Sequence, residues 1–271
     1  MIQKALGLTC LATVAALTPA LALDTELQLG PDEMRINLTL ENQQWSNGAM
    51  IHDGAVGRTS MDVRWYDVGI HLDGVLVLDG QSSSTITDFE TTEITAKIDY
   101  LFEIIDIAQI IPWVEVSSYP YDTGSFRYIW AGLDFWYLTP LQGLEAGASL
   151  QYNLADATPK SKRAYGEHHV VSTVGARYLY QAAPLDTMAF GLIDIASRSY
   201  ALHNTGVSNQ GLYTFRLGGQ VTLPMPWEEL WLVGKAQNIW YLDSDIRDSL
   251  ALAGRDRSEL VFSIGLEWAA E

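Results

Sequence analysis

The sequence predicts an all-β protein, namely a closed, antiparallel, up-and-down transmembrane β-barrel of about twelve strands, with about ten as the alternative. Two observations predict this fold class. Apolar and polar side chains alternate over many separate segments, which is typical of strands with two chemically different faces. In the second half of the chain, short proline-marked connectors also alternate with longer polar connectors. This is typical of a barrel with short turns at one end and long loops at the other, which we call the elaborated end.

The clearest alternation lies at the end of the chain, in the segment 260–268. Every second residue there is apolar, the last of them is Trp268, and a glycine, Gly265, stands between them. The same period of two predicts strands over 128–137, 143–153 and 213–223. Further strands are predicted nearer the amino terminus, at 34–42, 59–66, 70–78, 92–102 and 110–118.

Residues 1–22 predict a cleaved secretory signal peptide. Lys4 supplies a positive charge, residues 5–17 are apolar, and Ala20-Leu21-Ala22 fits the small-x-small cleavage pattern. The only cysteine of the chain also lies in this segment, which excludes a fold held by disulfides in the mature protein. The remainder, 23–271, is predicted to be one domain, because no linker or change of composition interrupts it.

The charge balance narrows the classes of partner. The chain has 33 acidic and 16 basic residues, for a formal net charge of −17. Such an excess of acids disfavours nucleic acid as a partner. It suits an exported protein that meets cations.

Period two alone does not separate a soluble β-sandwich or lipocalin-like barrel from a membrane barrel, because these folds differ in which face points outward. The composition of the polar face favours the membrane barrel, since it mixes small residues with charges of both signs, as a confined lumen requires. The expected lumen-lining residues are Arg35, Asp62, Arg64, Lys97, Asp99, Glu115, Asp134, Glu145, Arg177, Arg216, Lys235 and Glu267.

Aromatic residues near the strand ends also favour a membrane barrel, since tryptophan and tyrosine prefer the membrane–water boundary. No apolar run after residue 22 is long enough for a membrane helix, so a spanning chain would have to close its sheet. The residues expected in the two aromatic girdles are Trp113, Trp136, Tyr178, Trp231, Trp240 and Trp268.

On these features the chain resembles a bacterial outer-membrane β-barrel protein, of the porin-like superfamily, over residues 30–268. The closing segment 260–268 is similar to the carboxy-terminal assembly signal of that superfamily, although the chain ends in Trp-Ala-Ala-Glu. The resemblance implies a Gram-negative outer membrane, with outer-membrane lipids, lipopolysaccharide and the barrel-assembly machinery as partners. It also implies periplasmic termini and outer loops at 45–57, 79–90, 120–126, 155–167, 203–210 and 243–257.

Three functions remain open. The first is a narrow, porin-like channel for small polar or cationic solutes, favoured by the mixed charges of the polar face and the acidic loops. The second is a non-conducting barrel that is structural or binds partners through its outer loops. The third is a membrane-embedded lipid hydrolase that would use His168 or His169, which lie near Ser172.

The sequence favours a protein that is not an enzyme and has no cofactor. The acidic segment 243–248 is interpreted as a solvated loop, because it lacks the ligand number and spacing of a calcium site. The basic residues Lys160, Lys162 and Arg163 are likewise interpreted as a solubilising loop, although such residues can pair with phosphate.

Overall fold

The computed structural model describes residues 32–46, 49–78, 91–104, 107–119, 126–156, 169–182, 184–205, 207–227, 229–252 and 256–270. The predicted signal peptide 1–22 lies outside the described residues. His168 and the basic residues Lys160, Lys162 and Arg163 also lie outside them.

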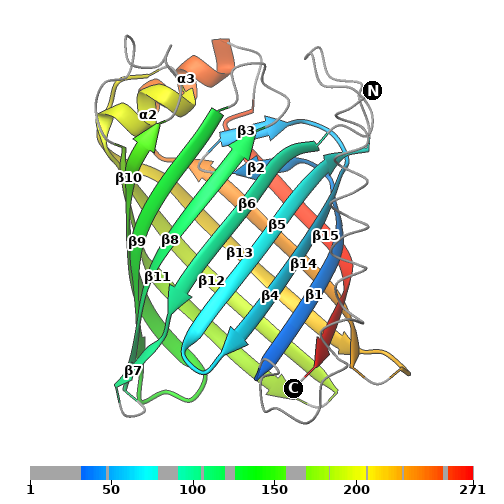
Figure 1. Ribbon diagram of the computed structural model, residues 1–271. Coiled ribbons are helices and arrows are strands. Elements are labelled where there is room, and N and C mark those ends of the chain that lie inside the picture. Colours follow the sequence, from blue (N-terminus) through cyan, green and yellow to red (C-terminus); the bar gives the residue numbers. More distant parts are fainter. Residues whose placement is uncertain are drawn as a thin grey trace.

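Twelve antiparallel strands form a closed barrel, which confirms the predicted fold class and selects twelve strands over ten. Each strand pairs with its neighbours along the chain, as an up-and-down barrel requires (Figure 1). The strands are β1 (Glu33–Glu41), β4 (Val56–Trp65), β5 (Val68–Val77), β6 (Thr91–Tyr100), β8 (Ala108–Tyr119), β9 (Phe126–Leu138), β10 (Leu144–Asp156), β11 (Val170–Ala182), β12 (Leu185–Ala196), β13 (Gly211–Pro224), β14 (Leu230–Tyr241) and β15 (Ser258–Ala270).

The barrel closes where the last strand pairs with the first. In the antiparallel register of β1 and β15, Leu38 lies opposite Leu266 and Thr39 lies opposite Gly265. Closure of the sheet, which the sequence predicts for a spanning chain, requires the first and last strands to pair, and the register confirms it. The short strand β7 (Phe102–Ile104) also pairs with β8, next to the β6–β8 pairing that completes the ring.

The elaborated end of the barrel carries structure that the sequence did not predict. The strands β2 (Gln44–Ser46) and β3 (Ala49–His52) form a separate two-stranded sheet, and α2 (Arg198–Thr205) and α3 (Ser244–Leu252) are helices. Figure 1 shows all four at the end opposite β7. No helix among the described residues is both long and apolar enough to cross a membrane.

A local signal explains why the acidic segment 243–248 begins a helix rather than an open loop. Asp243 caps α3, because its carboxylate accepts hydrogen bonds from the backbone N–H groups of Asp245 (2.8 Å) and Ile246 (3.1 Å). Ile246 and Leu250, four residues apart, are buried on one side of this helix. The expectation of a loop was therefore wrong for this segment, although Asp245 and Asp248 are exposed to solvent as expected.

The outer wall of the barrel is apolar. Leu40, Leu217 and Phe262 are 58%, 51% and 53% exposed, and each points away from the barrel interior. Charged side chains on the alternate positions point inward, as those of Arg58 and Asp73 do. The apolar-out arrangement distinguishes this barrel from a soluble one, in which the apolar faces would be packed together inside.

The seam between β1 and β15 leaves no room for a side chain at Gly265. A Cβ atom there would lie 2.3 Å from the carbonyl oxygen of Leu38 and 2.4 Å from Cγ2 of Thr39. We expect Gly265→Ala to lower the free energy of unfolding by about 1–3 kcal/mol, because the strands must separate to admit the methyl group. The measurement is urea unfolding in detergent, in which the folded and unfolded fractions are read from their separate bands on unheated gels.

The matched control for this substitution is Gly234→Ala on β14. A Cβ at Gly234 would meet nothing within 4 Å. This variant should be destabilised by no more than about 0.5 kcal/mol. Equal stability of the two variants would contradict tight packing at the seam.

Candidate functional site

The barrel interior is the candidate functional site, and ion pairs cross its wall between neighbouring strands. Near the ends of β4, β5 and β6, Arg64 forms an ion pair with Asp99 at 3.0 Å. His71 lies between two carboxylates, with its Nδ1 2.6 Å from Asp62 and its Nε2 hydrogen-bonded to Asp99. Three strands are therefore linked by side chains as well as by their backbones.

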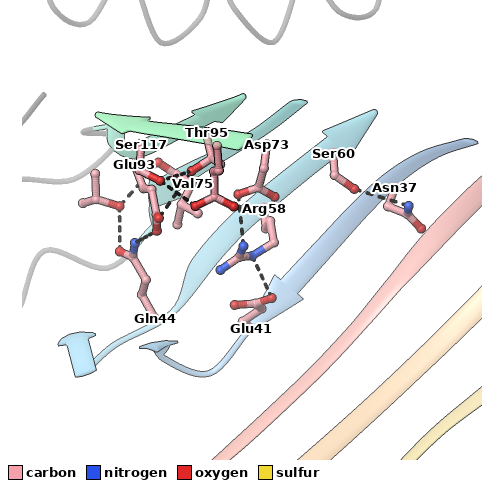
Figure 2. Close-up of polar contacts among 12 residues, drawn as sticks. Asn37, Glu41, Gln44, Arg58, Ser60, Asp73, Val75, Glu93, Thr95 and Ser117 are labelled. Atoms are coloured by element: carbon pink, nitrogen blue, oxygen red, sulfur yellow. Dashed lines mark hydrogen bonds and ion pairs between the residues drawn. The ribbon is translucent and has the colours of Figure 1, made fainter. Parts of the chain in front are cut away.

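A second cluster lies closer to the elaborated end (Figure 2). The guanidinium of Arg58 on β4 pairs with Glu41 on β1 at 3.1 Å and with Asp73 on β5 at 3.0 Å. Glu93 lies in the same group of side chains, as Figure 2 shows. Carboxylates thus outnumber cations at this place in the wall.

The segment that follows β1 folds inward and is tied to this cluster. Gln44 on β2 is completely buried. Its amide nitrogen donates to Glu93 at 3.0 Å, and its amide oxygen accepts a hydrogen bond from the Thr92 hydroxyl at 2.7 Å (Figure 2). These bonds hold the β2–β3 hairpin against the interior side of β6.

The adjacent part of the wall, on β8, β9 and β10, uses tryptophan and glycine pairs instead of ion-pair chains. Trp136 on β9 lies against Gly147 on β10, where a Cβ atom would come within 2.5 Å of the indole. The guanidinium of Arg177 lies 4.1 Å from the centre of this ring and pairs with Glu145 at 2.6 Å. The indole is thus held between a glycine backbone and a cation.

Trp113 on β8 repeats this arrangement one strand earlier. Its indole lies against Gly132 on β9, its register partner, where a Cβ atom would come within 2.2 Å. The ammonium of Lys97 lies 4.7 Å from the centre of the ring. Both tryptophans therefore lie flat on the inner wall.

A cavity of about 290 Å³ remains on this side of the interior. Its wall includes Lys97, Trp113, Glu115, Asp134, Trp136 and Arg216. Arg216 also pairs with Asp194 at 2.8 Å, and Asp194 accepts a hydrogen bond from Thr173 at 2.7 Å. Charges of both signs and two aromatic rings thus surround one open space.

An aromatic cluster fills the interior below the two helices. The ring of Tyr200 on α2 packs edge-to-face on Trp130 (6.2 Å between ring centres) and on Tyr213 (5.5 Å), and Tyr213 in turn packs on Tyr241 (6.0 Å). Ile246 on α3 joins the same buried cluster. Because Trp130 and Tyr241 are on the inner faces of their strands, the helices narrow this end of the barrel from within.

The remaining charged residues expected in the lumen are spread along the wall. Arg35 pairs with Glu33 at the start of β1, where the side chain of Arg35 is 51% exposed. Lys235 lines a smaller cavity of about 150 Å³ together with Glu41. Glu267 on β15 lies opposite Trp231 on β14. The structure therefore brings most of the expected charges together in pairs or cavities, and leaves these three apart from the main clusters.

The expected aromatic girdles need correction. Trp113 and Trp136 line the interior cavity. Trp231 is on the same side of β14 as Lys235, which lines the smaller interior cavity. Closeness to a strand end had suggested the girdle, but alternation along the strand and the space above Gly132 and Gly147 place the indoles inside.

The other three girdle candidates are on the outer wall. Tyr178 is 44% exposed and stacks on Tyr180, with 6.5 Å between ring centres. Trp240 stacks on Phe215 at 5.4 Å. Trp268 lies opposite Ile36 at the β1–β15 seam.

Sequence reasoning missed several interior residues. Arg58 lies one position before the strand that was predicted to begin at residue 59, yet it has the same parity as Asp62 and Arg64. Continued alternation would have identified it. The other missed members are Glu41, His71, Asp73 and Asp194, each on the inner side of its strand.

The structure separates His169 from Ser172, one pair considered for the hydrolase alternative. His169 is buried and packs near Trp130 and Tyr200, with ring centres 6.4 and 6.3 Å apart. Ser172 is at an odd spacing from His169, so the alternation of β11 places the two side chains on opposite faces of the sheet. A pair made by His169 and Ser172 is therefore excluded.

The fold and its two-faced wall define a class of protein: closed twelve-stranded β-barrels with an apolar exterior and a charged interior. No family model matches the chain, and no curated protein matches it. The solved structure of the NanC porin shares the fold, with a TM-score of 0.52, 9% identity, and coverage of 87% of this chain and 98% of that one.

Other solved barrels are similar as well. The KdgM porin matches with a TM-score of 0.48 and 8% identity over 88% of this chain and 99% of its own. The translocator domain of the autotransporter NalP from Neisseria meningitidis matches with a TM-score of 0.45 and 11% identity over 96% and 97%. At such low identities, these similarities concern the barrel fold alone.

The Arg58 cluster yields a stability prediction. Replacing Arg58 with methionine would leave Glu41 and Asp73 facing each other without the cation between them. We expect Arg58→Met to lower the free energy of unfolding by about 2 kcal/mol or more, because partly buried carboxylates lose their compensating charge. Urea unfolding in detergent measures the effect.

Arg35→Met is the matched control, since Arg35 is also paired but is more exposed. Exposed ion pairs contribute little, so this variant should lose less than about 1 kcal/mol. A loss for Arg58→Met no larger than that of the control would show that the cluster does not hold the wall together.

Proposed function

We propose that the protein is a narrow passive channel in the outer membrane of a Gram-negative bacterium, for small polar or cationic solutes. The observation that carries this proposal is the open, charge-lined cavity inside a barrel whose outer wall is apolar. The expected signal peptide, lipopolysaccharide contacts and use of the barrel-assembly machinery belong to the same proposal.

The preference for cations follows from the balance of charge along the inner wall. Two carboxylates, Glu41 and Asp73, share the single guanidinium of Arg58. In the cavity, Glu115 and Asp134 lie with Lys97, and the guanidinium of Arg216 is matched by Asp194. A wall with more acids than bases lowers the electrostatic free energy of a cation inside the barrel and raises that of an anion.

Planar-bilayer recording of the purified protein tests this proposal. We expect discrete current steps, and in a potassium chloride gradient a reversal potential with the sign of the potassium equilibrium potential, because cations would pass more readily than chloride. Heat-denatured protein at the same detergent concentration is the control. A folded barrel that gives no steps would contradict the channel, and an anion-selective potential would contradict the cation preference.

A non-conducting barrel is the second candidate, because the aromatic cluster below α2 and α3 narrows one end from within. Ile246 and Leu250 anchor α3 there, being 1% and 3% exposed. A barrel closed at this point would present its elaborated end to partners without passing solutes.

Loosening α3 separates these two candidates. We expect the double variant Ile246→Ala and Leu250→Ala to raise the single-channel conductance above that of the wild type, because the smaller side chains no longer hold the helix against the inner wall. Leu252→Ala is the matched control on the same helix, since Leu252 is 91% exposed and should leave the conductance unchanged. A channel whose conductance is equal in all three proteins would show that α3 does not limit the path.

A further inference from the structure

The cavity exists because one part of the inner wall is built from small residues. Gly147, Ser149, Thr173 and Gly175 line it on β10 and β11. On β4, β5 and β6, by contrast, long paired side chains such as those of Arg58 and Arg64 cross the wall. The cavity of about 290 Å³ therefore lies beside the strands whose inward residues are small.

The charges around this space are not fully neutralised by one another. Arg216 is matched by Asp194 at 2.8 Å. Among the described residues, neither Glu115 nor Asp134 has a cation within ion-pair distance; their hydrogen bonds come from Ser117 (3.0 Å) and Ser149 (2.6 Å). Lys97 lies over the indole of Trp113 rather than on a carboxylate. Two carboxylates thus share the space with one ammonium group.

A second observation points to a ligand with oxygen acceptors. Trp113 lines the cavity and is only 7% exposed. Its indole N–H finds no acceptor in the described part of the chain. A buried donor without a partner is costly, so a small shift of the indole that brings its N–H to an oxygen atom of a bound solute would be favourable.

We propose that this cavity is a binding site for a small organic ammonium compound that also carries hydroxyl or carboxylate oxygens. The negative charge of Glu115 and Asp134 would attract the ammonium group, and Lys97 with the Trp113 N–H would receive the oxygens. The indoles of Trp113 and Trp136 supply apolar surface for the carbon skeleton. A volume of about 290 Å³ suits a solute of the size of an amino acid or an amino sugar.

This inference rests on the proposed channel and names the class of solute that the channel would favour. Its test measures binding rather than conduction. The full-length protein in detergent micelles is titrated calorimetrically with glucosamine and with glucose, which differ only in the ammonium group. We expect glucosamine to bind at least tenfold more tightly, and a smaller preference would overturn the proposal.

Substitutions then locate the binding site. Glu115→Gln and Asp134→Asn keep the shape of each side chain and remove its charge, and each should weaken glucosamine binding at least fivefold while leaving glucose within twofold. Trp113→Phe removes the indole N–H and should weaken both sugars. Glu103→Gln, on the short strand β7 and outside the lining of the cavity, is the matched control and should bind as the wild type does.

Two outcomes would overturn the assignment of the site: glucosamine binding that both acid variants leave unchanged, or binding that the Glu103 control loses as well. The proposed channel can fail separately. A barrel that gives no current steps but binds glucosamine at Glu115 and Asp134 would refute conduction and leave the site standing. A cation-selective channel that binds glucosamine less than tenfold more tightly than glucose would support conduction and refute the proposed binding site.

Discussion

Closure of the sheet between β1 and β15 is the constraint on which the rest of the structure depends. An open sheet would leave two rows of backbone N–H and C=O groups unpaired, which hydrocarbon cannot satisfy. The register that joins Leu38 to Leu266 and Thr39 to Gly265 removes those edges. It also fixes which face of every strand points inward, because a shift of one residue would turn all side chains of a strand to the other face.

Once the faces are fixed, the size of the inward side chains decides how much of the interior stays open. On β1, β4, β5 and β6 long charged side chains pair across the wall, as Arg58 does with Glu41 and Asp73. On β8, β9 and β10 the glycines Gly132 and Gly147 let indoles lie flat. Paired side chains therefore fill the interior next to β1, β4 and β5, whereas a cavity remains between β6 and β11.

The two ends of the barrel differ in a related way. Short turns connect the strands at one end. At the other end, α2, α3 and the β2–β3 hairpin fold toward the interior (Figure 1). The buried contacts of Ile246 with the tyrosine cluster, and of Gln44 with Thr92 and Glu93, hold these segments in place. This end of the barrel therefore contains packed side chains, whereas the described connections at the other end are short turns.

The sequence by itself determined the fold class, the position of most strands and the pairing of the last strand with the first. It could do so because alternation of apolar and polar residues is a local property, and closure follows from the need to pair every backbone group. Only the tertiary structure decided that Trp113 and Trp136 lie inside, since this depends on glycines in neighbouring strands. It also decided that Glu115 and Asp134 both line one cavity, because strand register and side-chain volume are properties of the assembled wall.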